Sequence, residues 1–173
     1  MDHGDTPGEV VGKALAFLKK YKWKLTEEDR GVALSHAALQ GELDIVEILL
    51  NDGSITIKAK VSALIKAAQN GSLDVVRVIL EKGSISGIAK GEALKNAIQG
   101  GHLHIVQFLL LGNSLFPEER GKALKVAVYY GQIDIVAALL EDGFIPGDAK
   151  VGALMQAVQQ GEKEIVRVLL ESN

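Results

Sequence analysis

GELDIVEILL, at residues 41–50, decides the fold, because close copies of this stretch return along the rest of the chain. Every copy begins with a glycine, and successive glycines lie 30 residues apart without an insertion. Repetition in one register predicts a chain built from equal units, each of which packs against its neighbours. The other copies are GSLDVVRVIL at 71–80, GHLHIVQFLL at 101–110, GQIDIVAALL at 131–140 and GEKEIVRVLL at 161–170.

A second phrase, rich in alanine, precedes each of these glycines. In the unit at 54–83, its alanines and a leucine recur at the spacing of one helical stripe. After Gly71, leucine, valine and isoleucine form the stripe of a second helix. Each unit is therefore predicted to contain two helices and no strand. The recurring alanines are Ala33, Ala37, Ala63, Ala67, Ala93, Ala97, Ala123, Ala127, Ala153 and Ala157.

Residues with strong capping preferences mark the ends of these helices. A glycine or asparagine follows the second helix, and a left-handed C-cap is expected there. A good N-cap or a proline precedes the next first helix. Thr26 followed by Asp29 is close to a capping box, with aspartate in place of glutamate. The C-terminal positions hold Gly53, Gly83, Asn113 and Gly143, and the N-terminal positions hold Thr26, Thr56, Ser86, Pro117 and Pro146.

The two helices of a unit differ in side-chain size. The first helix uses alanine in its stripe, whereas the second uses isoleucine, valine and leucine. Small residues let the first helices approach one another more closely, so the stack must bend with these helices on its concave side. We predict an all-α fold, a curved helical solenoid of about five helix-turn-helix repeats with an N-terminal half-repeat cap.

The string A-L-x-x-A-A-x-x-G-x-L-D-I-V-x-x-L-L-x-x-G, complete at 33–53, resembles the core of the ankyrin repeat. Two features depart from that family. Its threonine-proline-leucine-histidine turn is missing from every unit, and the repeat has 30 residues instead of roughly 33. The deficit falls where the family builds a β-hairpin. We therefore expect a short loop without paired strands at 53–57, 83–87 and 143–147.

The resemblance implies one ankyrin-like domain over 1–173. Lys163 occupies a row that is otherwise apolar, which suits the last helix of an array that is complete. Within the domain, we expect residues 1–7 to be disordered, residues 8–30 to form the N-terminal cap, and the repeats to span 31–60, 61–90, 91–120, 121–150 and 151–173.

Composition excludes several classes of function. Of the 173 residues, 47% are hydrophobic and 24% charged, as in a globular domain. The absence of cysteine excludes disulfides, thiolate zinc sites and cysteine nucleophiles. The net charge of -3 gives no electrostatic basis for binding nucleic acid or an anionic membrane. No apolar run approaches the roughly 18 residues needed to span a membrane, and the N-terminus is polar. We therefore expect a cytoplasmic protein that binds neither nucleic acid nor a membrane. We also expect it to be a monomer.

No set of residues predicts catalysis or a cofactor. His102 and His104 are two residues apart, so on a helix they point about 200° apart and cannot share a metal. GEVVGK at 8–13 is one residue short of a phosphate-binding loop, and Ala14 follows it where serine or threonine is needed. We therefore predict no catalytic residue, no metal ligand and no enzyme activity.

A row of cations occupies one position in every unit. Stacked helices would place these cations along one side of the array, as a track for an acidic partner segment. Alternatively, each cation serves its own unit by covering apolar surface or pairing with a nearby carboxylate. The constancy of the row favours the structural interpretation. Its members are Arg30, Lys60, Lys90, Arg120 and Lys150.

Other positions on the first helix vary freely, and the family resemblance places them in a concave groove that contacts partners. Tyr129 and Tyr130 depart most from the amides usual at their positions, and neither is needed for the core. The bland alternative is ordinary surface, or rings that only cover the seam between two units. We predict that the two tyrosines form the centre of a partner-binding set that also includes Leu39, Gln69, Asn70, Gln99, Lys125, Met155, Gln159 and Gln160.

The resemblance implies a non-catalytic module that binds another protein on its concave face. An alternative is the substrate-docking or targeting region of a larger enzyme or bacterial effector whose catalytic part lies outside this chain. Repeats of 30 residues resemble those in ankyrin-rich proteins of intracellular bacteria. For a secreted effector, the partner would be a host protein in the host cytosol.

Overall fold

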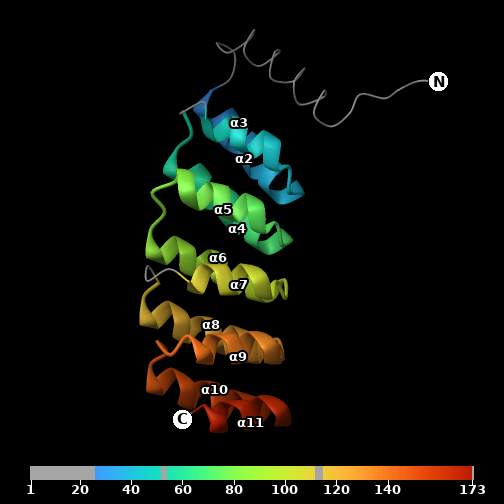
Figure 1. Ribbon diagram of the computed structural model, residues 1–173, viewed down its shortest axis with the longest axis vertical. Coiled ribbons are helices and arrows are strands. Elements are labelled where there is room, and N and C mark those ends of the chain that lie inside the picture. Colours follow the sequence, from blue (N-terminus) through green and yellow to red (C-terminus); the bar gives the residue numbers. More distant parts are fainter. Residues whose placement is uncertain (1–25, 52–53, 112–114, 173) are drawn as a thin grey trace, which may run out of the picture.

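A computed structural model of the protein describes residues 26–51, 54–111 and 115–172. Within these ranges the chain forms ten helices and no strand. Consecutive helices pair, and the pairs stack in chain order into one column, with the turns inside the pairs along one edge (Figure 1). The predicted disorder of residues 1–7 and most of the predicted cap at 8–30 lie outside the described residues.

Each pair consists of a long helix followed by a shorter one. The long first helices are α2 (Glu27–Gln40), α4 (Ile57–Asn70), α6 (Gly87–Gln99), α8 (Pro117–Tyr129) and α10 (Gly147–Gln160). The shorter second helices are α3 (Leu43–Asn51), α5 (Leu73–Lys82), α7 (Leu103–Leu110), α9 (Ile133–Glu141) and α11 (Lys163–Glu171). The two helices per unit expected from the sequence are therefore present.

The predicted N-caps Thr26, Thr56 and Ser86 each precede a first helix. In all three, the side-chain oxygen accepts a hydrogen bond from the backbone N–H three residues later. The backbone N–H of Thr26 also donates to Asp29 Oδ2 at 2.9 Å, which completes the capping box. The hydrogen bonds from the side chain and backbone of Thr26 lower the pKa of the Asp29 carboxyl.

The C-terminal glycines of the second helices behave differently from one another. Gly143 has a φ of 74°, the left-handed conformation expected from the sequence. At Gly83 that expectation is wrong, because the residue is extended, with a φ of -119°. Glycine is needed there for space instead, since a Cβ would lie 2.7 Å from the carbonyl oxygen of Ile79. Gly53 and Asn113 lie outside the described residues.

The described parts of the connections between pairs contain no strand. Residues 54–56, 83–86 and 143–146 run from one pair to the next without pairing. The predicted absence of hairpins is therefore confirmed over the described residues, with residue 53 outside them.

The core lies between the first and second helices and along the seams between pairs. Ala63, Ala93 and Ala123 are fully buried, and successive first helices contact one another more closely than successive second helices do. At Gly121, a Cβ would lie only 2.8 Å from the Cβ of Ala149 on the next first helix. The small residues thus shorten one side of the stack, as the curved solenoid requires.

Candidate functional site

The outward side of the first helices carries the residues whose identity changes from unit to unit. We call this side of α2, α4, α6, α8 and α10 the first-helix face. All ten predicted binding residues lie on it or at its end near the helix turns, and Leu39 is half-buried. The exposed ones are Gln69, Asn70, Gln99, Lys125, Tyr129, Tyr130, Met155, Gln159 and Gln160.

Tyr129 and Tyr130 form an exposed aromatic pair at the C-terminal end of α8. Their side chains are 63% and 47% exposed. The ring centroids are 5.2 Å apart and the planes are nearly perpendicular, at 88°, an edge-to-face arrangement that aromatic rings prefer. Gln160 Nε2 donates to the backbone carbonyl of Tyr129 at 3.2 Å, which ties the end of α10 to that of α8. Neither ring belongs to the buried core.

Lys125 lies at the seam between α8 and α10. Met155, on α10, is 61% exposed. Lys125, one turn before Tyr129, extends over Gly152 of α10. A Cβ at Gly152 would lie 3.1 Å from Lys125 Cε and 3.4 Å from its Nζ. The absence of a side chain at Gly152 therefore leaves the space that Lys125 occupies.

Lys95 and Lys122, on the same face, each form an ion pair with a glutamate of their own helix. Lys95 Nζ lies 2.6 Å from Glu92 Oε1, and Lys122 Nζ lies 2.9 Å from Glu119 Oε1. The hydrogen bond and the charge of Glu119 raise the pKa of Lys122. Lys125 makes no hydrogen bond or ion pair within the described residues.

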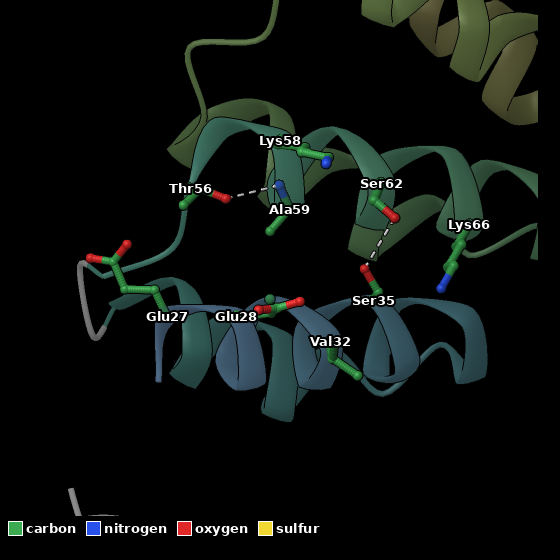
Figure 2. A pocket seen from close by; sticks show the side chains of 10 residues that line it. Glu27, Glu28, Val32, Ser35, Thr56, Lys58, Ala59, Ser62 and Lys66 are labelled. Carbon is green, nitrogen blue, oxygen red and sulfur yellow. Dashed lines mark hydrogen bonds between the residues drawn. The ribbon is translucent and has the colours of Figure 1, made fainter. Parts of the chain in front are cut away.

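An open cleft of about 630 Å³ lies between α2 and α4 (Figure 2). Its floor is made by small residues, and Ser35 Oγ donates to Ser62 Oγ at 3.2 Å across it. In Figure 2 the carboxylate of Glu28 lies between the two helices, and Lys66 extends from α4 toward α2. The repeat pattern does not predict this cleft, although the small residues Gly31 and Ala59 indicate that the two helices meet closely.

Four members of the basic row bond to groups at or just after the C-terminal end of the second helix that follows. Lys60 Nζ donates to the carbonyl oxygen of Lys82 at 3.2 Å, and Lys150 Nζ donates to that of Ser172 at 3.3 Å, at the C-terminal ends of the second helices. The guanidinium of Arg30 donates to Ser54 Oγ at 2.6 Å. These contacts support the structural interpretation of the row.

Arg120 is the most buried member of the basic row, at 3% exposed. Its guanidinium pairs with Asp142 and donates to the carbonyl of Leu115. The guanidinium carbon also lies 5.3 Å from the centroid of the Phe144 ring. A cation held in this way is not available to a partner.

Within the described residues, His102 and His104 belong to no group arranged to hold a metal ion. His102 Nε2 is hydrogen-bonded to the carbonyl of Gln69 at 3.0 Å, and its ring lies over Gly71 in the preceding turn. His102 therefore links two units, a contact that the sequence does not predict. His104 is exposed on α7. No group of histidine, aspartate and glutamate in the described ranges is arranged to hold a metal ion.

None of the helices in the described part of the chain is both long and apolar enough to cross a membrane.

A family model described as ankyrin repeats, with three copies, matches residues 8–89. The 30-residue register of that segment continues through the glycines at 101, 131 and 161. No curated protein matches the chain.

Proposed function

Because residues 8–89 identify this chain as a member of the ankyrin-repeat family, we propose that it binds a partner protein through the first-helix face and carries out no catalysis. Ankyrin repeats are generally protein–protein interaction modules. Such repeats are commonly cytosolic, and the cytoplasm is the compartment we propose for this interaction.

The division of labour within the repeats supports this proposal. Positions that pack between helices keep the same small or apolar residues in nearly every unit, whereas positions on the first-helix face differ in charge, size and polarity. A rigid scaffold with a varied surface can present a specific pattern of groups to one partner at little cost in conformational entropy.

The exposed tyrosine pair is the observation that carries the proposal. Tyrosine combines a large apolar ring with a hydrogen-bonding tip and is enriched among residues that dominate binding energy. Two such rings stand in contact on α8, and about half or more of each remains in solvent. A partner that covers them would bury a large apolar area, which makes Tyr129 and Tyr130 the proposed centre of the interface.

Affinity capture with three baits tests the proposal. The baits are the unmodified chain, the double variant Tyr129→Gln/Tyr130→Gln and Leu111→Gln. Leu111 is exposed and apolar but follows the second helix α7, so its variant is a control for lost exposed apolar surface. We expect that the unmodified chain and Leu111→Gln capture the same protein. We expect the double variant to bind this protein more weakly, by about 2 kcal/mol or more of binding free energy.

Thermal melting separates binding from packing. If the rings contribute to recognition, the double variant melts close to the unmodified chain. A much lower melting temperature with intact capture by the folded fraction would mean that the tyrosines only cover the seam between units. Equal capture by all three baits would contradict the placement of the site.

A further inference from the structure

The seam between α8 and α10 differs from the other seams of the first-helix face in its electrostatics. We define the α8–α10 seam by Lys125 and Tyr129 on α8 and by Gly152 on α10. Tyr129 stands one helical turn after Lys125, so an exposed tyrosine ring and an exposed ammonium group lie on the same stretch of α8. A seam with cations already paired to carboxylates, with a cluster of acidic residues, or with apolar residues alone would favour a different kind of ligand.

The charge of Lys125 is unbalanced because of its place in the sequence. Lys95 and Lys122 each have a glutamate three residues earlier, on the same side of the helix, and each pairs with it. Three residues before Lys125 stands Lys122, another cation. No described residue gives Lys125 a hydrogen bond or an ion pair. An incoming carboxylate would therefore not compete with a partner inside the chain.

The position of Lys125 depends on Gly152. Equivalent positions in the preceding units hold Val32, Ser62, Glu92 and Lys122, all with side chains. At Gly152 the lysine stem crosses onto α10 within 3.1 Å of where a Cβ would stand. This contact brings the ammonium group into the seam, in the direction of the helix that carries Met155.

We propose, as an extension of the proposed function on which it rests, that the α8–α10 seam binds a peptide segment with an aspartate or glutamate next to a large apolar residue. The carboxylate pairs with the ammonium of Lys125, which offers three donors. The apolar side chain packs against the exposed ring of Tyr129.

The acidic residues of the same face define where the carboxylate can lie. Glu118 on α8 and Asp148 on α10 are exposed near the N-terminal ends of their helices. Glu118 is two helical turns, about 10 Å, before Lys125. Their charges repel a carboxylate from that end of the seam, so the acidic residue of the peptide lies at Lys125. The part of the peptide that extends toward Glu118 and Asp148 is neutral or basic.

Selection from a random peptide display library on the full chain tests this inference. We expect selected peptides to carry an acidic residue adjacent to a large apolar one. The strongest peptide is then synthesised, and its affinity is measured by titration calorimetry at low and at high salt. Affinity should fall as salt rises, because the pair is exposed.

Two lysine variants with the same loss of charge provide the decisive comparison. Lys125→Gln should weaken the peptide by about fivefold, near the upper limit for an exposed ion pair. Lys58→Gln, on the outward side of α4, removes an equally exposed cation that has no ion pair in the described residues, and should leave the affinity unchanged. Melting curves of both variants check that the fold is intact.

A second pair of variants compares an acidic side chain at residue 152 with an uncharged one of nearly the same size. Gly152→Glu places an acid beside Lys125, whereas Gly152→Gln adds nearly the same volume without charge. If the free cation recognises the peptide, Gly152→Glu binds more weakly than Gly152→Gln.

Several results would overturn the inference. They are enrichment of basic or uncharged peptides, an affinity insensitive to Lys125→Gln, equal binding by the two Gly152 variants, or no enrichment at all. Loss of binding in Tyr129→Gln/Tyr130→Gln without any effect of Lys125→Gln would leave the proposed function standing and refute only the acidic specificity.

Discussion

The packed side and the outward side of the first helices differ in how far their residues stay the same from one unit to the next. On the packed side, the same alanines and cations return from unit to unit; most of these alanines are buried, and four of the cations make hydrogen bonds or an ion pair. On the outward side, a serine pair, neutralised lysines and an unpaired lysine occupy equivalent places. The backbone register is the same throughout, so the differences between units come from side chains.

A position that stays the same in every unit therefore indicates a structural role, even when its residue is charged. The basic row could have been a track for a partner, but four of its members bond to groups at or just after the end of the following second helix. If their role is structural, changes on the packed side should alter stability and leave partner binding unchanged.

The largest effect is expected from Arg120→Met. This change removes a cation that is 3% exposed and leaves Asp142 and the carbonyl of Leu115 without their partner. Breaking a buried ion pair costs about 3 kcal/mol or more of unfolding free energy. Urea denaturation measures the loss, and binding to a captured partner should not change in the folded protein.

Lys60→Met is the matched control for Arg120→Met. Lys60 holds the same position of its unit but gives a single hydrogen bond, at 3.2 Å, to the carbonyl of Lys82. Its replacement should cost about 1 kcal/mol at most. Equal losses in the two variants would mean that burial does not distinguish members of the row.

Gly121→Val is expected to have the next largest effect. A Cβ at residue 121 would stand 2.8 Å from the Cβ of Ala149, so α8 and α10 must move apart. Overpacking of this kind costs about 1–3 kcal/mol, which thermal or urea unfolding can resolve. An unchanged stability would show that the first helices can separate without loss.

Gly152→Ala is the counterpart of that change on the outward side. Its new methyl group would meet only the flexible end of Lys125, at 3.1 Å from Cε, and the lysine can move. Because glycine inside a helix is less favourable than alanine, we expect stability to rise by about 0.5–1 kcal/mol. A lower stability would indicate that the position of Lys125 over Gly152 matters for the fold.

The sequence predicts this fold closely because its signals lie in rows of constant spacing. The caps at Thr26 and Thr56, the glycines between helices and the alanine stripe all depend on residues near one another in the chain, and each is present. Local propensity and periodicity are sufficient for such features.

The remaining features depend on contacts between units, which row spacing does not describe. The bond between Ser35 and Ser62 and the bond of His102 to Gln69 join residues 27 and 33 apart in the chain. Gly83 is extended and not left-handed, and a Cβ at this residue would lie 2.7 Å from the carbonyl oxygen of Ile79. The relation of one unit to the next must be known before such pairs can be identified.

The smallest expected effect concerns the capping box of α2 and its dependence on pH. The hydrogen bonds from the side chain and backbone of Thr26 lower the pKa of Asp29 below its usual value of 3.8. A group whose pKa is lower in the folded state adds stability above its unfolded pKa, and that contribution is lost as pH falls through the folded pKa. Asp29→Asn removes the titrating group but keeps the size of the side chain. We therefore expect the unmodified chain to be more stable than Asp29→Asn near pH 7, with a gap that narrows below about pH 4.

The caps at Thr56 and Ser86 provide the control, because the residues three positions later are Ala59 and Ala89, which cannot titrate. Thr56→Ala should lower the free energy of unfolding by about 1 kcal/mol, and the loss should be the same at both pH values. Urea unfolding at neutral and acidic pH measures all three proteins. A gap between the unmodified chain and Asp29→Asn that stays constant with pH would mean that the carboxylate charge does not strengthen the box, and Thr26 would then act as Thr56 does, through its hydroxyl alone.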